Sequence, residues 1–171
     1  LLNVENSLLS RCSKPKYLVC EDEYPSINLE QGIVEVLKHP TVSCKSFLIT
    51  IGDRTVGGCT SRDQMVGPWQ TPVADCAVML TSFWSKQGVA LALGERPPIA
   101  VFDVNASVRM CLGELITNIL AAPITNISDI KLSANWMGAV DEEFSNYDLY
   151  SAVSSINNIC IECNISIPVG K

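Results

Sequence analysis

The sequence has a single histidine, and this scarcity excludes several kinds of active site. His39 is followed directly by Pro40, where a predicted helix gives way to a loop. A Ser-His-Asp or Cys-His arrangement needs a histidine placed to take a proton from the nucleophile, and this position is unsuitable. The Gly-x-x-x-x-Gly-Lys-Ser/Thr pattern of a P-loop is also missing, because Gly170-Lys171 lacks the upstream glycine. Neither chemistry is therefore expected.

Charged residues are also scarce. They make up 18% of the 171 residues, and acidic ones are in excess, so the formal net charge is -6. A nucleic-acid surface needs a basic patch, so we expect no nucleic-acid partner. No apolar run approaches the roughly 20 residues that cross a bilayer, so we expect no membrane partner. Hydrophobic residues reach 47%, which suits one globular domain with a core and excludes a disordered chain.

Cysteine is not scarce, but its pattern does not indicate a disulfide framework. Several of the eight cysteines lie inside apolar runs, where a free thiol behaves as a small hydrophobic side chain. Cys160 and Cys163 have the spacing of a zinc pair, yet no second pair or nearby histidine completes four ligands. We therefore expect a reducing compartment and a cytoplasmic protein. The first residues lack an initiator Met and a charged n-region, so we expect no signal peptide and an excised or partial chain.

The apolar periodicity predicts helices and strands that alternate without a regular rhythm, which favours an α+β class over a doubly wound sheet. Residues 1–37 are interpreted as a linker-like arm with a first helix, and residues 38–171 as the main domain. The predicted helices are 26–37, capped by Ser26, 105–120 and 146–159. The predicted strands are 47–51, 72–82, 127–134 and 164–169, with a short apolar stretch at 88–92 and a brief strand or extended segment at 99–102.

One carboxylate stands inside an apolar run and marks the first candidate site. Asp75 lies between Ala74 and Cys76 in a segment that predicts full burial, where a charge needs a partner. In the predicted helix 105–120, Glu114 and Asn118 are four residues apart and share one face beside the apolar stripe. Two carboxylates and an amide oxygen suit nucleotide-bound magnesium. Spacing alone favours the alternative, in which the helix pair is an ordinary border and Asp75 bonds to an arginine or a backbone amide.

Two further polar groups have two interpretations each. One group crowds a loop and either contacts phosphate or ribose, or forms an ion-pair cluster that fixes the loop: Asp53, Arg54, Arg62, Asp63 and Gln64. The other group occupies alternate positions of one strand and either lines a nucleotide pocket or faces solvent: Lys131, Ser133 and Asn135. Both pairs of interpretations remain open on the sequence alone.

Five segments resemble phosphoribosylformylglycinamidine synthase, the family of ATP-dependent glutamine amidotransferases of purine synthesis. They are collinear from about residue 38 to residue 171 and read FLITIGDRTVGG, RDQMVGPWQTPVADCAV, GERPP, GELITNI and KLSANWM. The resemblance is to the N-terminal subdomain of the family's second aminoimidazole-ribonucleotide-synthetase-like half, incomplete at its C-terminal end. It implies an α+β fold with a mixed or antiparallel sheet and helices packed on one face. Between Met137 and Leu149 the sequence departs from the family, which usually has a glycine-bearing loop there.

The resemblance also implies ligands and a role. The family's magnesium ligands fall on Asp75, Glu114 and Asn118, with Ala74 beside the nucleotide and a fourth ligand beyond residue 171. ATP or ADP with Mg²⁺ is therefore expected, as is packing against the remaining domains or a homologous half. The family converts formylglycinamide ribonucleotide, glutamine and ATP to formylglycinamidine ribonucleotide. No catalytic side chain is assigned in this chain, which we expect to be inactive alone. The alternative is a non-catalytic scaffold that uses nucleotide structurally.

Overall fold

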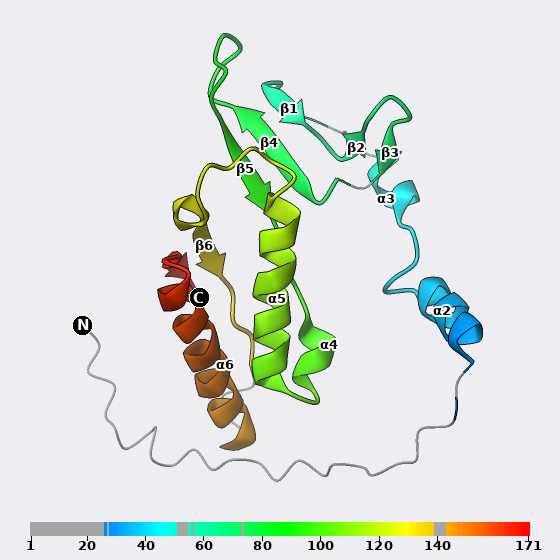
Figure 1. The fold of residues 1–171 in the computed structure, drawn as a ribbon, viewed down its shortest axis with the longest axis vertical. Coiled ribbons are helices and arrows are strands. Elements are labelled where there is room, and N and C mark those ends of the chain that lie inside the picture. Colours follow the sequence, from blue (N-terminus) through cyan, green and yellow to red (C-terminus); the bar gives the residue numbers. More distant parts are fainter. Residues whose placement is uncertain (1–25, 27, 51–54, 56, 73, 139–142) are drawn as a thin grey trace.

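Two long helices, α5 (Val104–Ile119) and α6 (Glu143–Glu162), pack side by side in the computed structural model (Figure 1). The structure describes residues 26, 28–50, 55, 57–72, 74–138 and 143–171. The first turn of α5 is capped by Asp103, whose carboxylate accepts the backbone N–H of Ala106 at 2.9 Å. This cap sets where α5 begins, close to the predicted start at residue 105.

The largest sheet in the described residues has three antiparallel strands in the order β1-β4-β5. These strands are β1 (Thr60–Arg62), β4 (Cys76–Leu80) and β5 (Gly88–Ala92). β4 and β5 pair without a bulge from Cys76 opposite Ala92 to Leu80 opposite Gly88. The strand predicted over 72–82 is therefore shorter than expected, and the apolar stretch at 88–92 is its partner.

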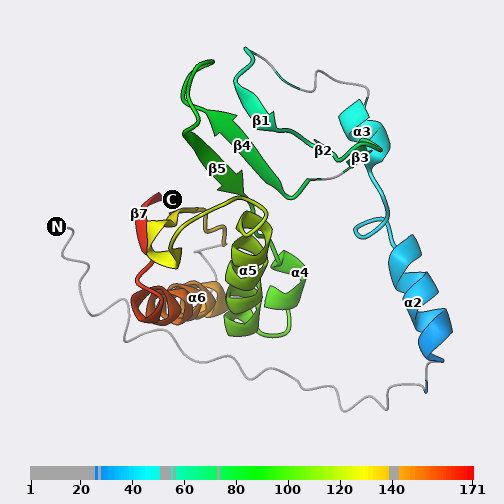
Figure 2. The same cartoon turned by 45° about the horizontal axis from the view of Figure 1, so that its top comes forward.

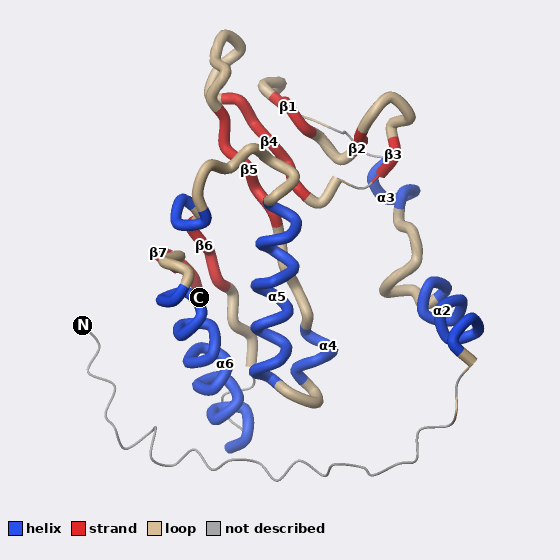
Figure 3. The backbone as a smooth tube through the Cα atoms, in the orientation of Figure 1, coloured by secondary structure: helices blue, strands red, loops and turns tan. Residues whose placement is uncertain are grey.

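Two smaller sheets complete the pairing in the described residues (Figure 3). β2 (Met65–Val66) pairs antiparallel with β3 (Thr71–Pro72). β6 (Lys131–Ala134), which follows the short 3-10 helix η1 (Ile127–Asp129), pairs in parallel with β7 (Ser166–Gly170). Parallel strands need a long connection, and α6 supplies it. The α+β class is confirmed, with antiparallel and parallel pairs in different sheets.

The hydrophobic core joins α5 and α6 to the β6–β7 pair and to the start of β4. Its most buried member is Cys76, the first residue of β4, which is only 1% exposed on the inner face of the antiparallel sheet. The remaining buried members of this cluster are Leu112, Ile119, Ala122, Ile130, Leu132, Ile156, Cys160 and Ile165. Since α5 contributes Leu112 and Ile119 and also contacts β5, this helix connects both sheets to one core.

The other face of the antiparallel sheet is exposed and apolar. Strand alternation sends Cys76, Val78 and Ala90 inward, toward the core. The side chains between them point outward, and Met79, Val89 and Leu91 are each about half exposed. We call this surface the outer sheet face: Ala77, Met79, Val89, Leu91 and the following Leu93. Figure 2 shows the sheet beyond one end of α5, so the described helices leave this face open.

The strand predicted over 47–51 is wrong within the described residues. Residues 46–50 form the short helix α3 (Ser46–Thr50), in which Thr50 Oγ1 donates to the Ser46 carbonyl at 2.9 Å. No described strand pairs with them, and an extended run without a partner leaves its backbone groups unsatisfied. Phe47 and Leu48 are mostly exposed, so the apolar run was a poor indicator of burial.

Two other boundaries differ from expectation. The first helix in the described residues is α2 (Leu29–Lys38), and its cap is Asn28, not Ser26, because the Asn28 carboxamide oxygen accepts from the backbone of Glu30 and Gln31. The segment expected to be extended at 99–102 overlaps α4 (Pro97–Ala100), which Pro97 and Pro98 begin. α2 lies apart from the α5–α6 pair in Figures 1 and 2. None of the described helices combines the length and apolarity needed to cross a membrane.

We expect Leu112→Ala to destabilise the domain by about 2–5 kcal/mol, because the truncation leaves a cavity at a side chain that is 3% exposed. Urea unfolding measures the change in free energy. The control is Leu120→Ala, just beyond the same helix at 63% exposure, which should cost less than about 1 kcal/mol. Equal losses in the two variants would contradict this assignment of the core.

Candidate functional site

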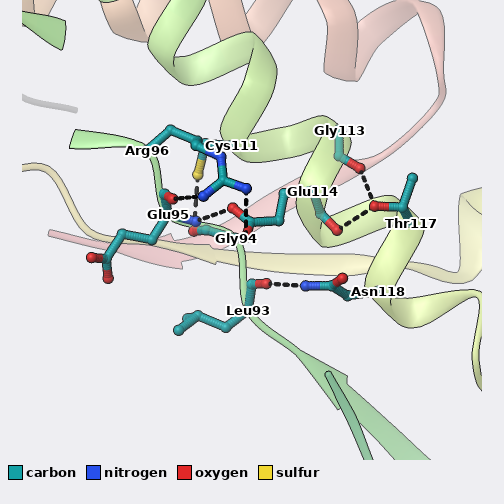
Figure 4. Close-up of polar contacts among 9 residues, drawn as sticks. All are labelled: Leu93, Gly94, Glu95, Arg96, Cys111, Gly113, Glu114, Thr117 and Asn118. Atoms are coloured by element: carbon teal, nitrogen blue, oxygen red, sulfur yellow. Dashed lines mark hydrogen bonds and ion pairs between the residues drawn. The ribbon is translucent and has the colours of Figure 1, made fainter. Parts of the chain in front are cut away.

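Four polar side chains of α5 face the segment 93–96, which links β5 to α4. They follow one another at intervals of four, three and four residues, so they lie along one side of the helix. We call them the α5 stripe: Ser107, Cys111, Glu114 and Asn118. Each one makes a hydrogen bond to the linking segment, and Figure 4 shows three of the four. The stripe therefore fixes the end of β5 against the helix.

Glu114 makes the strongest of these contacts, because both of its carboxylate oxygens are engaged. Oε2 accepts the backbone N–H of Glu95 at 3.0 Å, and Oε1 pairs with Arg96 Nη2 at 3.0 Å (Figure 4). The Glu114 side chain is 25% exposed and the Arg96 side chain 43% exposed. Charge-assisted bonds at such a partly shielded place are stronger than those between neutral groups.

Asn118 is oriented by a single bond at the end of β5. Its Nδ2 donates to the Leu93 carbonyl at 3.0 Å, which turns the amide oxygen away from Leu93 (Figure 4). A metal binds the oxygen of an amide and not its nitrogen, so this orientation leaves the useful atom free of the Leu93 contact. The sequence prediction that Glu114 and Asn118 share one helix face is confirmed.

The other two members of the stripe anchor the same segment. Ser107 Oγ donates to the Arg96 carbonyl at 2.6 Å, and Cys111 Sγ donates to the Gly94 carbonyl at 2.9 Å. Burial raises the pKa of the Cys111 thiol above its ordinary value, and the nearby Glu114 and Glu95 carboxylates raise it further. Cys111 therefore stays a neutral donor here.

Gly94 lets the strand end approach the helix this closely. A Cβ at this position would overlap the backbone carbonyl oxygen of Cys111 and lie 2.9 Å from the backbone nitrogen of Leu115. Both are rigid helix atoms that cannot move aside as a flexible side chain can. The absence of a side chain at residue 94 thus sets the distance between the linking segment and α5.

Asp75 is less buried than the sequence predicted. It immediately precedes β4 and is exposed, so the expectation of a fully buried carboxylate is wrong. The β4–β5 pairing ends at Cys76 opposite Ala92, and Asp75 itself lies in the bend just before β4. The half-buried Ala74 is fixed separately, since its N–H donates to the Gln64 carbonyl at 3.0 Å.

The oxygen atoms of Asp75, Glu114 and Asn118 fit a magnesium site in chemical type. Asp75 is accessible, Glu114 is partly exposed, and each oxygen that accepts a hydrogen bond has a second lone pair. The set has two carboxylates and one amide, which leaves positions for phosphate oxygens and water. Across the part of the chain that the structure describes, no three His, Cys, Asp or Glu side chains gather as a metal centre.

The other predicted polar groups are placed as follows. Asp53 and Arg54 lie outside the described residues. Asp63 Oδ1 accepts the backbone N–H of Met65 at 2.8 Å, which supports the loop, and the Nε of Arg62 is buried without a hydrogen-bond partner. The polar group on β6 and just beyond it lies on one exposed face of the strand, as the alternation predicted: Lys131, Ser133 and Asn135. Their contact with a nucleotide remains a prediction.

Sequence reasoning missed Arg96, Ser107 and Cys111 as members of this arrangement. The available signal was the spacing of the polar positions along α5, which continues from Glu114 and Asn118 back to Cys111 and Ser107. No sequence spacing indicated Arg96, because α4, a turn and the first part of α5 separate it from its partner Glu114.

These features define an α+β domain in which one face of α5 carries an acidic and an amide side chain against the segment that follows β5. The family model of the FGAR-AT PurM_N-like domain matches residues 44–171, and the chain therefore belongs to this family. The match confirms the resemblance to formylglycinamide ribonucleotide amidotransferase and to its PurM-like half. The family is of the ligase type, uses ATP and acts in purine biosynthesis.

We expect Gly94→Ala to destabilise the domain by about 1–3 kcal/mol, because the new methyl group must displace helix backbone. The control is Gly113→Ala on the same helix, where the new Cβ meets nothing within 4 Å. That variant should gain about 0.5–1 kcal/mol from better helix propensity. Chemical unfolding of both variants gives the sign directly, and a neutral Gly94→Ala would show that the close approach is not required.

Proposed function

We propose that this domain holds a nucleotide through Mg²⁺ bound by Asp75, Glu114 and Asn118, with Ala74 beside the nucleotide. The observation that carries the proposal is the α5 stripe, which fixes Glu114 and Asn118 against the residues that follow β5. Asp75 precedes β4, the strand paired with β5, so the three side chains belong to adjoining segments. Membership of an ATP-using family supports the same site.

Each residue has a distinct part in this proposal. Asp75 is the accessible carboxylate, and its exposure leaves its oxygens open to an incoming cation. Glu114 is held by the Glu95 N–H, so its carboxylate does not have to be ordered when the cation arrives. Asn118 offers its oxygen because Leu93 holds its nitrogen. These three residues would hold magnesium, which would supply positive charge to offset that of the nucleotide's phosphates.

The proposed reaction is that of the family, in which formylglycinamide ribonucleotide, glutamine and ATP give formylglycinamidine ribonucleotide. ATP transfers its γ-phosphoryl group to the amide oxygen and leaves as ADP. Ammonia, released as glutamine is hydrolysed to glutamate, then forms the new C–N bond, and the oxygen leaves as phosphate. This domain's part is to bind nucleotide with magnesium, within a cytoplasmic protein that packs it against other domains or a homologous half. The isolated chain is proposed to be inactive.

A second candidate function is a scaffold in which the domain does no chemistry and nucleotide, if bound, is structural. Two observations favour it. Glu114 and Asn118 already support the fold through their bonds to the linking segment. The outer sheet face is broad and apolar, as expected of a surface that packs against another domain.

We expect Asp75→Asn to abolish tight nucleotide retention in the full-length protein, because the site loses a negative charge and one good magnesium ligand. Nucleotide released on denaturation of the purified variant, measured against wild type by chromatography, gives the occupancy. The control is Asp129→Asn, which neutralises another exposed aspartate, in η1, and should retain nucleotide normally. Full retention in Asp75→Asn would refute the proposed site.

Turnover with the same variants separates the two candidate functions. If the nucleotide in this domain takes part in the reaction, Asp75→Asn lowers turnover while the unfolding temperature stays close to that of wild type. If the domain is a scaffold, turnover stays near normal and the loss appears in the unfolding temperature. Asp75→Ala gives a stronger form of the same comparison.

We also expect the isolated 171-residue chain to associate through its outer sheet face, since this exposed apolar surface is where a homologous half would pack. Sedimentation at increasing concentration should show dimers or larger species. Leu91→Lys places a charge on this face at a residue that is 56% exposed, and it should shift the chain toward monomer. A strictly monomeric wild-type chain would contradict the expectation.

A further inference from the structure

We propose that Arg96 is the resident counter-ion of Glu114, that a divalent cation displaces it, and that its guanidinium then binds the phosphate of the nucleotide. This inference rests on the proposed function, because it assigns a positioning role to a residue beside the proposed magnesium ligands. It adds a side chain of the GERPP segment to which neither the sequence spacing nor the family resemblance assigned a role.

The first observation is that Arg96 occupies the approach to Glu114. The Glu95 backbone N–H takes Oε2 at 3.0 Å, and a backbone donor cannot leave without moving the chain. Oε1 is instead held by a side chain that can move, because Arg96 Nη2 lies 3.0 Å from it. Magnesium binds oxygen at about 2.0–2.1 Å, so it would bring a double positive charge next to the guanidinium.

The second observation is that the Arg96 side chain can leave without unfolding the segment. Its backbone is held independently, because its carbonyl accepts Ser107 Oγ at 2.6 Å. Arg96 is the N-cap residue of α4, but its side chain makes no capping hydrogen bond. Among the described residues its guanidinium makes one hydrogen bond besides the Glu114 pair, to the neighbouring Glu95 carbonyl at 3.3 Å, and the side chain is 43% exposed.

The third observation concerns charge. Figure 4 shows the carboxylate of Glu95 directed away from Glu114, so it does not hold Arg96 in place of Glu114. A guanidinium displaced by a cation needs a new anion, and the fork of its N–H donors matches a phosphate. A nucleotide whose phosphates reach the same cation brings that anion to the site. Arg96 would thus weaken binding of the cation alone and strengthen binding of the cation together with the nucleotide.

The experiment uses Mn²⁺ as the probe in the full-length protein stripped of nucleotide. Free Mn²⁺ is measured by electron paramagnetic resonance, and the site in this domain is taken as the binding that Asp75→Asn removes. Arg96→Gln should bind Mn²⁺ roughly tenfold more tightly than wild type, because the cation no longer has to displace a positive charge from Glu114. Arg96→Lys keeps the charge and should bind Mn²⁺ much as wild type does.

Arg109→Gln is the matched control. It removes the same charge from a residue on α5, where Arg109 Nη1 bonds to Ser155 Oγ at 3.4 Å, away from the linking segment. Its Mn²⁺ affinity should change by less than about twofold, because exposed charges at a distance are screened by salt. Unfolding temperatures of all variants show whether the fold is retained.

The second measurement adds ADP in the presence of Mn²⁺. Arg96→Gln should bind this nucleotide roughly tenfold more weakly than wild type, since the charge-assisted bond to phosphate is lost. A merely structural role for Arg96 predicts that both affinities fall together. The proposal therefore depends on opposite changes in the two affinities.

The outcomes are separable from those of the proposed function. If wild type has no Mn²⁺ binding that Asp75→Asn removes, the proposed magnesium site itself is wrong. If that binding exists and Arg96→Gln leaves it unchanged or weakens it, the counter-ion role is overturned while the site stands. If Mn²⁺ binds more tightly but ADP does not bind more weakly, the transfer of Arg96 to phosphate is overturned.

Discussion

The close contact between α5 and residues 93–96 is the constraint on which the rest of the domain depends. Gly94 permits the approach, and four side chains at helical spacing then satisfy the backbone of the segment. Because β5 precedes this segment and pairs with β4, the contact positions the antiparallel sheet relative to the helix. Because α5 also carries core residues that face α6 and β6, it positions the sheet relative to the core.

The same side chains that hold the fold are the ones assigned to the ligand. Asn118 supports Leu93 with its nitrogen and keeps its oxygen for another partner, whereas Glu114 supports the Glu95 backbone with one oxygen and holds Arg96 with the other. These bonds order the side chains before a ligand arrives, which lowers the entropic cost of binding. It also means that a truncation at either residue leaves a backbone group without its partner.

Sequence reasoning found the two long helices and the shared face of Glu114 and Asn118 because both depend on local periodicity. It failed where the outcome depends on distant segments. The apolar run at 47–51 carries no information about whether a strand lies beside it, and residues 46–50 form a helix instead. The burial of Asp75 was inferred from its apolar neighbours, but β4 begins only at Cys76. The ion pair of Arg96 depends on how a loop folds onto a helix, which no spacing encodes.

The parallel pairing of β6 with β7 has a consequence for synthesis on the ribosome. β6 carries the buried Leu132, and its partner strand β7 follows α6 in the sequence. When α5 and β6 have left the ribosome, their apolar faces still lack their partners. They must stay in a partly collapsed state until α6 and β7 have also left the ribosome. The antiparallel β4–β5 pair, whose strands are close in sequence, can form without that delay. The β4–β5 pair can thus assemble early, from strands close in sequence. The β6–β7 pair assembles only after β7 has been translated.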